Sequence, residues 1–429
     1  MAEKYWVGNA GTWDVSTTTH WSDSSGGAGG ATAPTSADNA NFNTLSGTGD
    51  ITITTGVCNN LVFLMTAATG RAIILSANFA PAGNLSLDSN SVLATQRLLI
   101  QSNALGTART ITCNGTVTAN YCDFQDITGA GTASWDLSGA TGASGNCGGN
   151  SGMTLSTPIT CYAVKGVSAL FSSAMWFTTS GGASAARNPL PQDTARFDAS
   201  SVTAASLTFT QDLQRIGSIN FTSVTNTPTL TTSTICTCYG SITLVSGMVL
   251  TASTTTYTFS GRGANTLASG TLTWAKNFEV DCANGSLALS DNFVTGATKT
   301  LVITSGAFTA TNQNVTCRSL TTVSGSTLTM GSGTWTFGMT VSGTVFSASA
   351  GVTFSGAAAT IILNGVRTAE QTFTTGDNTF GTFSDNSTGA FSLKLTGSGT
   401  FTSFTMSAGR TVNFTAGTTT TSATWVLSG

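Results

Sequence analysis

The sequence predicts an all-β protein: a parallel β-helix or β-solenoid that opens with a duplicated module rich in aromatic residues and glycine. Three observations lead to this prediction: short alternating runs along the whole chain, an internal duplication, and a repeat of about 21 residues near the C-terminus. The alternative that these observations leave open is a row of tandem β-sandwich domains. We expect three parts: a first β module with a Trp/Gly-rich entrance loop (1–156), a second, duplicated module (157–300) and C-terminal solenoid coils (301–429).

Short runs in which Thr or Ser alternates with Val, Ile, Leu or Phe fill the chain, and almost no window has helical periodicity. Examples are 50–54, 241–245, 300–304 and 391–395. Threonine suits an exposed strand face, because its branched Cβ packs on the pleat while its hydroxyl stays in water. Only six prolines occur in 429 residues, so few of the strand ladders are interrupted.

A set of residues near the N-terminus recurs 155 positions later. The set comprises a tryptophan, a Gly-Gly-Ala triplet, a proline, an aspartate and a phenylalanine. Its matched members are Trp21 and Trp176, 26–28 and 181–183, Pro34 and Pro189, Asp38 and Asp193, and Phe42 and Phe197. Five matches at one offset indicate a duplicated module. Because each aspartate precedes a strand-like phenylalanine by four residues, we expect Asp38 and Asp193 to cap turns rather than to act in catalysis.

A shorter repeat appears near the C-terminus, where Phe380 and Phe383 align with Phe401 and Phe404, and Trp425 follows 21 residues after Phe404. About 21 residues is the length of one coil of a parallel β-solenoid. Upstream, apolar clusters at 61–63, 73–75, 85–87 and 98–100 recur nearer to every 12 residues, which fits either shorter coil faces or an antiparallel meander. The strand-like segment 423–429 suggests a trimer partner, a further coil or another subunit over that edge.

The composition argues against an enzyme. The chain has 15 Lys+Arg, 18 Asp+Glu and one histidine, so few acids, bases or ligands exist to form a catalytic or cofactor site. A net charge of −3 gives no electrostatic footprint for nucleic acid. No apolar stretch approaches the roughly 20 residues needed for membrane insertion, and the first residues lack the apolar core of a signal peptide.

Nine cysteines are present, which is an odd number: Cys58, Cys113, Cys122, Cys147, Cys161, Cys236, Cys238, Cys282 and Cys317. Cys236 and Cys238 fall on one face of a strand, but their spacing is not that of a zinc site, and one histidine cannot complete a mixed site. We therefore expect no metal, and we expect the thiols to act as small buried hydrophobic groups.

Five residues near the glycine-rich loops form a candidate docking or glycan-stacking surface: Trp6, Trp13, His20, Trp21 and Trp176. The alternative is that the tryptophans cap the end of the solenoid and exclude water from its core. His20 is replaced by Met175 in the second module, so the module does not need an imidazole, which argues against catalysis.

Asp123 and Asp126 form the one local acidic cluster, within 121–126. Two carboxylates beside aromatic residues could bind or cleave a glycan if both faced one cleft. We favour the structural interpretation, which is a strand followed by a turn that Asp126 initiates over 126–131.

Several segments resemble repetitive structural proteins encoded by tailed bacteriophages. They are 5–14 with 20–22, 26–30 and 34–38, and then 123–128, 147–152 and 414–421. The second module departs from the pattern, with 163–166 in place of the Trp-Val-Gly opening. The resemblance implies a fibre, spike or head-decoration protein, commonly a β-solenoid and often a homotrimer, and it carries over no catalytic residues.

The leading hypothesis is therefore a non-enzymatic virion structural protein, made in the host cytoplasm and displayed on the particle surface. Its expected partners are other virion proteins of the capsid or tail, copies of itself and a host cell-surface glycan. One alternative is a tailspike glycan depolymerase, which needs paired carboxylates in a groove. Another is a bacterial surface adhesin, which needs an export signal or an anchoring domain.

Overall fold

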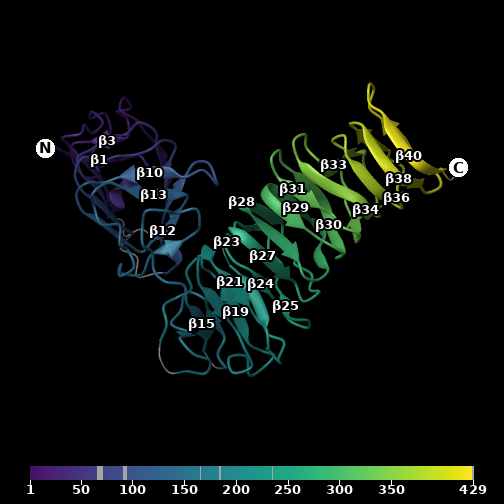
Figure 1. Cartoon of the computed structure of the whole chain (residues 1–429), viewed down its shortest axis with the longest axis horizontal. Helices are drawn as coiled ribbons and strands as arrows, with labels where there is room; N and C mark the ends of the chain where they lie inside the picture. The colour runs from purple at the N-terminus through teal and green to yellow at the C-terminus, as the bar shows by residue number, and fades with distance from the viewer. Residues whose placement is uncertain (65–70, 90–93, 165, 183–184, 234, 428–429) are drawn as a thin grey trace. The chain divides into compact units, whose positions relative to one another are not determined.

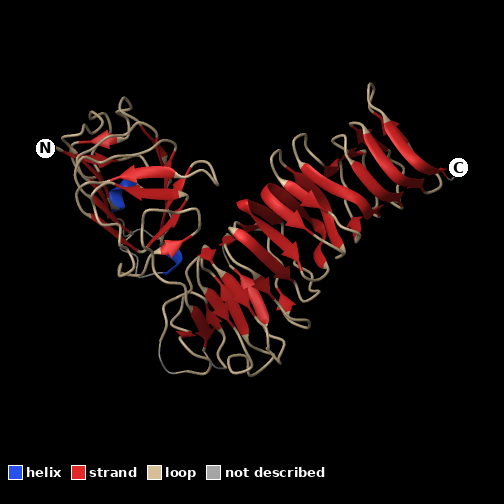
Figure 2. Ribbon diagram, viewed as in Figure 1, coloured by secondary structure: helices blue, strands red, loops and turns tan. Residues whose placement is uncertain are grey.

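The computed structural model describes residues 1–64, 71–89, 94–164, 166–182, 185–233 and 235–427. Stacked parallel coils form a β-solenoid of about 17 turns, and about 1% of the chain is helical. Within the described residues the helices are two 3-10 turns, η1 (Thr44–Ser46) and η2 (Ala94–Gln96), and strands dominate (Figure 2). The predicted fold class is confirmed, and the parallel stacking rules out tandem β-sandwiches.

The chain forms two compact units. Unit 1 comprises Met1–Cys161, Phe171–Thr194 and Asp212–Gly217. Unit 2 comprises Tyr162–Leu170, Ala195–Gln211 and Ser218–Gly429. The segment between residues 160 and 216 thus contributes to both units, at the place where the duplicated module begins.

The first 14 strands belong to unit 1. They are β1 (Glu3–Trp6), β2 (Gly11–Trp13), β3 (Trp21–Ser22), β4 (Asn39–Phe42), β5 (Ile51–Ile53), β6 (Leu61–Leu64), β7 (Ala72–Leu75), β8 (Leu85–Asp88), β9 (Leu98–Ser102), β10 (Arg109–Thr112), β11 (Val117–Asn120), β12 (Cys122–Gln125), β13 (Ile127–Ala130) and β14 (Gly145–Asn146). They form two six-stranded sheets, ordered β11-β8-β6-β4-β1-β3 and β14-β12-β9-β7-β5-β2, and the pair β10-β13. Within the described residues, these strands pair in parallel, except that β1 is antiparallel to β3.

From β4 to β9, consecutive strands alternate between the two larger sheets of unit 1, which explains the 12-residue spacing. Leu61 of β6 pairs with Leu85 of β8, and Ile73 of β7 pairs with Ile100 of β9, so each coil contributes one strand to each sheet. All four side chains are buried. The apolar clusters are therefore short coil faces, and the antiparallel meander is wrong for this region.

Six strands lie in the segment shared by the units: β15 (Thr160–Ala163), β16 (Ala169–Leu170), β17 (Trp176–Phe177), β18 (Thr194–Arg196), β19 (Thr208–Gln211) and β20 (Arg215–Ile216). The remaining strands belong to unit 2. They are β21 (Ser218–Asn220), β22 (Thr229–Thr232), β23 (Cys236–Cys238), β24 (Ile242–Thr243), β25 (Val249–Leu250), β26 (Tyr257–Phe259), β27 (Gly263–Ala268), β28 (Phe278–Leu289), β29 (Phe293–Thr309), β30 (Val315–Thr322), β31 (Thr327–Thr329), β32 (Thr334–Phe337), β33 (Gly343–Ser347), β34 (Thr353–Leu363), β35 (Gln371–Thr374), β36 (Thr379–Asp385), β37 (Leu393–Thr396), β38 (Gly399–Met406), β39 (Val412–Phe414) and β40 (Thr420–Leu427).

The strands of unit 2 stack as successive rungs, from teal β21 to yellow β40 in Figure 1. β29 runs without a break through residue 300, so the predicted boundary between the second and third parts falls inside a strand. A smaller sheet, ordered β16-β19-β22-β25, forms another face of the early coils of unit 2.

The predicted 21-residue repeat is the coil register. Phe380 pairs with Phe401, Phe383 with Phe404, and Phe404 with Trp425. The rings of Phe383 and Phe404 stack at 4.7 Å with an interplanar angle of 12°. Phe380, Phe383, Phe401 and Phe404 are buried, so stacked phenylalanines fill the interior of these coils, whereas Trp425 is 40% exposed.

The duplication is visible in matching turns. Asp38 accepts hydrogen bonds from the backbone N–H groups of Ala2 (3.0 Å) and Thr35 (3.1 Å). Asp193 accepts from the N–H groups at the equivalent positions, those of Ile159 (2.8 Å) and Leu190 (2.9 Å). The prediction that these aspartates cap turns is confirmed. The Gly-Gly turn also repeats, with Gly27 bonded to Ser24 and Gly182 bonded to Thr179, whereas position 183 lies outside the described residues.

All nine cysteines are buried and none of them forms a disulfide, as expected of thiols that act as small hydrophobic groups. Cys236 and Cys238 lie on the same inward face of β23. Burial raises the pKa of the Cys236 and Cys238 thiols to about 12, so both are neutral and unreactive at physiological pH.

Asparagine side chains tie the corners of successive coils together. Asn314 donates its N–H to Oδ1 of Asn292 (2.9 Å), and its own Oδ1 accepts from the N–H of Thr334 (2.8 Å). We expect Asn314→Ala to lower the free energy of unfolding by about 1 kcal/mol, because the Thr334 N–H loses its acceptor. Chemical denaturation measures the difference.

The matched control is Asn312→Ala. Within the described part of the chain, the carboxamide of Asn312 accepts only from the exposed hydroxyl of Ser332, which can turn to water instead. Its expected effect is within about 0.5 kcal/mol. Equal losses in both variants would contradict a role for the corner asparagines in holding the backbone register.

Candidate functional site

The tryptophans expected to form a surface are buried instead. Trp6, Trp13, Trp21 and Trp176 are each at most 1% exposed. The first three pack together, with Trp21 edge-on to both Trp6 and Trp13 at ring distances of 5.3 Å. The tryptophans therefore do not form the predicted glycan-stacking surface. Burying a large aromatic ring in the core stabilises the fold more than leaving it exposed to solvent. The structure agrees with the alternative interpretation, in which the tryptophans exclude water from the core.

His20 is the one member of the set that is partly exposed. Its ring stacks on Trp6 at 4.7 Å and 8°, and Nδ1 lies 3.2 Å from the carbonyl oxygen of Val7. These contacts use one face and one edge of the imidazole to close the aromatic cluster, which is a structural role.

Asp126 does not begin a turn over 126–131, and this prediction is wrong. Residues Ile127–Ala130 form strand β13, and the change of direction takes place at Asp126 alone, where φ is +54°. The carboxylate of Asp126 is buried and accepts from the N–H of Gly106 (2.9 Å). A single residue in the left-handed region of backbone space changes the chain direction here, where a turn of several residues was expected.

Asp123 lies at the centre of a buried ion cluster in unit 1. Its Oδ1 accepts from Nε of Arg97 (2.6 Å), and its Oδ2 accepts from Nε of Arg215 (2.7 Å). Its side chain is fully buried, and those of Arg97 and Arg215 are 8% and 11% exposed. Both oxygens of the carboxylate are thus engaged, which leaves it no role as a general acid or nucleophile.

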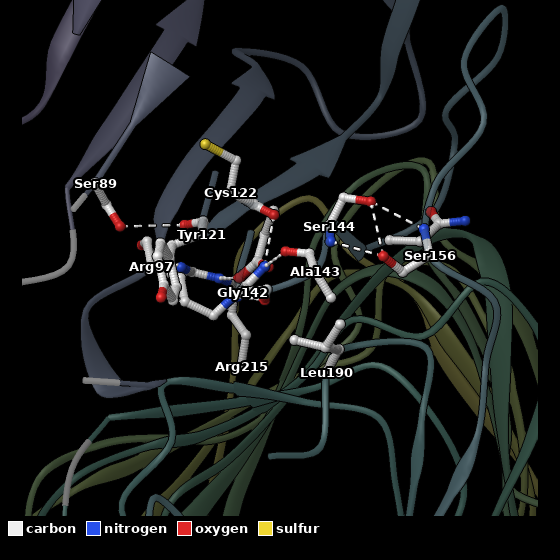
Figure 3. Close-up of polar contacts among 12 residues, drawn as sticks. Ser89, Arg97, Tyr121, Cys122, Gly142, Ala143, Ser144, Ser156, Leu190 and Arg215 are labelled. Atoms are coloured by element: carbon white, nitrogen blue, oxygen red, sulfur yellow. Dashed lines mark hydrogen bonds and ion pairs between the residues drawn. The ribbon is translucent and has the colours of Figure 1, made fainter. Parts of the chain in front are cut away.

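Arg97 also binds the backbone around it. Its Nη2 donates to the carbonyl oxygens of Cys122 (2.7 Å) and Ala143 (2.8 Å), and its Nη1 donates to that of Gly142 (2.7 Å). These bonds appear among the dashed lines of Figure 3, in which Arg97 lies beside Tyr121 and Gly142. Arg215 adds a bond from Nη2 to the carbonyl oxygen of Arg97 (2.6 Å), so the cluster is a cross-linked unit.

At two positions beside the ion cluster, only glycine leaves room for the neighbouring side chain. A Cβ at Gly145 would lie 1.9 Å from Oδ1 of Asp123, so the carboxylate occupies space that any other residue would fill. At Gly142, where φ is +68°, a Cβ would lie 2.1 Å from Cδ1 of Tyr121. The Tyr121 ring therefore lies directly against the turn that Arg97 holds.

Burial and the two arginines act in opposite directions on the pKa of Asp123. Burial alone would raise it, but the charges and hydrogen bonds of Arg97 and Arg215 outweigh that effect and hold the pKa below its usual 3.8. At Asp193 burial prevails and the pKa is raised, although two backbone N–H groups and Arg187 oppose it.

A cavity of about 300 Å³ opens beside this cluster. Its lining consists of three arginines, one tyrosine, one asparagine and four small or apolar residues. They are Arg97, Arg187, Arg215, Tyr121, Asn188, Gly142, Ala143, Pro189 and Leu190. None of the described residues that line it is acidic, and Asp123 and Asp193 bind the arginines without being part of the wall. The cavity wall thus carries three guanidinium groups, each of which is bonded to a buried carboxylate.

Comparison with known protein families, with curated proteins and with solved structures found no match. The function of this chain therefore has to be argued from its own residues.

In the part of the chain that the structure describes, no three or more His, Cys, Asp or Glu side chains gather to hold a metal ion. The same described residues contain no helix long and apolar enough to cross a membrane.

Sequence reasoning singled out Asp123 but missed all three arginines. A usable signal existed in the strand starts: Arg97 directly precedes Leu-Leu-Ile, and Arg215 directly precedes an isoleucine. In a chain with 15 basic residues, an arginine beside a buried strand is unusual enough to indicate an ion pair.

Proposed function

We propose that the chain is a non-enzymatic structural protein of a bacteriophage particle, a fibre, spike or head-decoration protein that presents a rigid β-solenoid on the particle surface. The observation that carries the proposal is the coil register, in which each strand of unit 2 pairs with its equivalent one coil later. Such stacking makes a rod whose length depends on the number of coils. Structural proteins of particles need that property.

The surface of the rod fits the same role. Threonine, serine and asparagine fill its outward positions, as in β38 and β40, where Thr400 pairs with Thr421. Hydroxyl and amide groups keep a long protein hydrated without creating long-range charge fields. We propose a homotrimer as its assembly, docked on capsid or tail proteins of the virion.

The acids proposed for glycan cleavage give no support to a depolymerase. Asp123 is held by two arginines, and Asp126 is 2% exposed. A glycosidase needs two carboxylates that face one substrate. We therefore expect no release of oligosaccharide when the protein is incubated with capsular or lipopolysaccharide glycan from the host, and release would contradict the non-enzymatic assignment.

The direct test is the composition of particles. We expect the chain to copurify through density gradients with phage particles from the lysate, at a fixed copy number relative to the major capsid protein. Quantitative mass spectrometry measures the ratio before and after a high-salt wash, which removes adhering host proteins. Absence of the chain, or a ratio that falls on washing, would reject the proposal.

A further inference from the structure

We infer that the interior of unit 2 binds a single halide ion, chloride under physiological conditions, beside the ammonium group of Lys276. The site goes beyond the proposed function, because it completes the core of the early coils of unit 2, where Figure 1 labels β21, β24 and β25. Four features carry the inference: the charge of Lys276, the hydrogen-bonding groups around it, the apolar lining and the size of the cavity.

Lys276 carries an ammonium group into the interior of unit 2. The residue is 3% exposed, and its Nζ donates to the hydroxyl oxygen of Thr232. Among the residues that the structure describes, Nζ forms no ion pair with a carboxylate. Burying an ammonium group is costly unless an anion compensates its charge. A bound anion therefore stabilises the folded state here.

The charges near Lys276 point the same way. Burial and, to a lesser extent, the positive charge of Lys299 lower the pKa of Lys276 to about 8, so the amine is still largely protonated at neutral pH. The neighbouring thiol of Cys236, with a pKa of about 12, is neutral and supplies no negative charge. Lys299 donates to the carbonyl oxygen of Ser253 (2.9 Å), and it too forms no ion pair with a carboxylate among the described residues. The two lysines leave net positive charge around the cavity, which favours an anion.

The polar groups of the lining are suited to an acceptor. Trp274 is 3% exposed and lines the cavity with Lys276, and its Nε1–H has no acceptor among the described residues. An ammonium group and an indole N–H donate hydrogen bonds but cannot accept them. The hydroxyl groups of Thr232 and Tyr257, which complete the polar lining, can each donate as well. A water molecule needs acceptors for its own hydrogens, whereas a halide ion only accepts, so this set of groups favours the halide.

The cavity is small and otherwise apolar. Its volume of about 10 Å³ is close to the minimum of roughly 10–15 Å³ that one water molecule needs. A monatomic ion of similar size therefore fits, whereas sulfate and phosphate, with four oxygens each, are too large. The rest of the lining consists of aliphatic side chains from β21, β22, β24 and β25, which are Ile219, Leu230, Ile242 and Leu250.

Thermal unfolding of the full-length chain at constant ionic strength and neutral pH tests the inference. Sodium gluconate, whose anion is too large for the cavity, is replaced stepwise by sodium chloride. Because chloride binds the folded state and not the unfolded one, we expect the melting temperature of unit 2 to rise by about 2–4 °C along a saturating curve. A melting temperature that stays constant, or that changes without saturation, would overturn the inference.

A pair of variants locates the site. Lys276→Met removes the ammonium group and keeps most of the side-chain volume, so we expect the chloride-dependent rise to disappear. Lys394→Met makes the same change on β37, outside the cavity lining, and should keep the rise. Equal responses of the two variants to chloride would overturn the site.

Bromide provides a second test on the unaltered chain. Crystals grown in sodium bromide are measured at the X-ray absorption edge of bromine, and we expect an anomalous difference peak in contact with Nζ of Lys276. Density at this place without an anomalous signal would identify a water molecule and overturn the inference. The result is independent of whether the chain is found in phage particles.

Discussion

Asp123→Asn is expected to lower the free energy of unfolding of unit 1 by about 3–5 kcal/mol. The substitution keeps the shape of the side chain but removes the charge that compensates Arg97 and Arg215, both nearly buried. The two buried guanidinium groups then lose the carboxylate charge that Asp123 places between them. Denaturant unfolding, followed by a probe in the Trp6–Trp13–Trp21 cluster, reports on unit 1.

The same variant has a predicted effect on pH dependence. Because the folded-state pKa of Asp123 lies below 3.8, its contribution to stability is complete above about pH 4 and is lost as the pH falls through the folded-state pKa. Asp193, whose pKa is raised, acts in the opposite sense. We expect the loss of stability on acidification to be smaller in Asp123→Asn than in the native chain.

Asp136→Asn is the control. Asp136 is exposed, and among the described residues its carboxylate accepts hydrogen bonds only from Ser138. Its replacement should change the unfolding free energy by no more than about 0.5 kcal/mol. If Asp123→Asn behaved like this control, the ion cluster would not be what holds this part of unit 1 together.

Arg367→Met is expected to cost unit 2 a similar amount, about 3–5 kcal/mol. Nη2 of Arg367 lies 3.1 Å from both oxygens of Asp385, and both side chains are fully buried. Nε of Arg367 also donates to Oε1 of Gln371 (3.3 Å). Methionine fills much of the same volume but leaves the Asp385 carboxylate without a counter-ion. Guanidinium denaturation followed by far-UV circular dichroism measures the loss.

The double variant Arg367→Met/Asp385→Leu separates charge from packing. Replacing both partners removes the unpaired charge, so the double variant should be more stable than Arg367→Met alone. Arg318→Met, at a half-buried position of β30 in the same unit, should stay within about 0.5 kcal/mol of the native chain. A double variant less stable than Arg367→Met would indicate that packing, rather than the buried charge, accounts for the loss.

The fold could be predicted from the sequence because each coil of a solenoid places the same residue types at the same positions as the coil before it. Phe383, Phe404 and Trp425 occupy equivalent positions in successive coils, so their spacing alone gave the register. The capping role of Asp38 and Asp193 was predictable for the same reason, since a duplicated turn repeats its hydrogen bonds.

The site was less predictable, because it depends on contacts that no local pattern encodes. The bond between Arg215 and the carbonyl oxygen of Arg97 joins residues 118 positions apart. The burial of the tryptophans was misjudged for a related reason. Glycine-rich loops beside Trp13 and Trp21 suggested exposure, whereas the strands around them form a core large enough to enclose both rings.

The most direct test of the central claim is a cryo-electron microscopy map of intact phage particles. If the chain is a particle protein as proposed, we expect a protruding density that accommodates unit 2, with coils stacked about 4.8 Å apart, the spacing of hydrogen-bonded strands. Particles whose external densities are all accounted for by other proteins, with this chain absent from them, would contradict it.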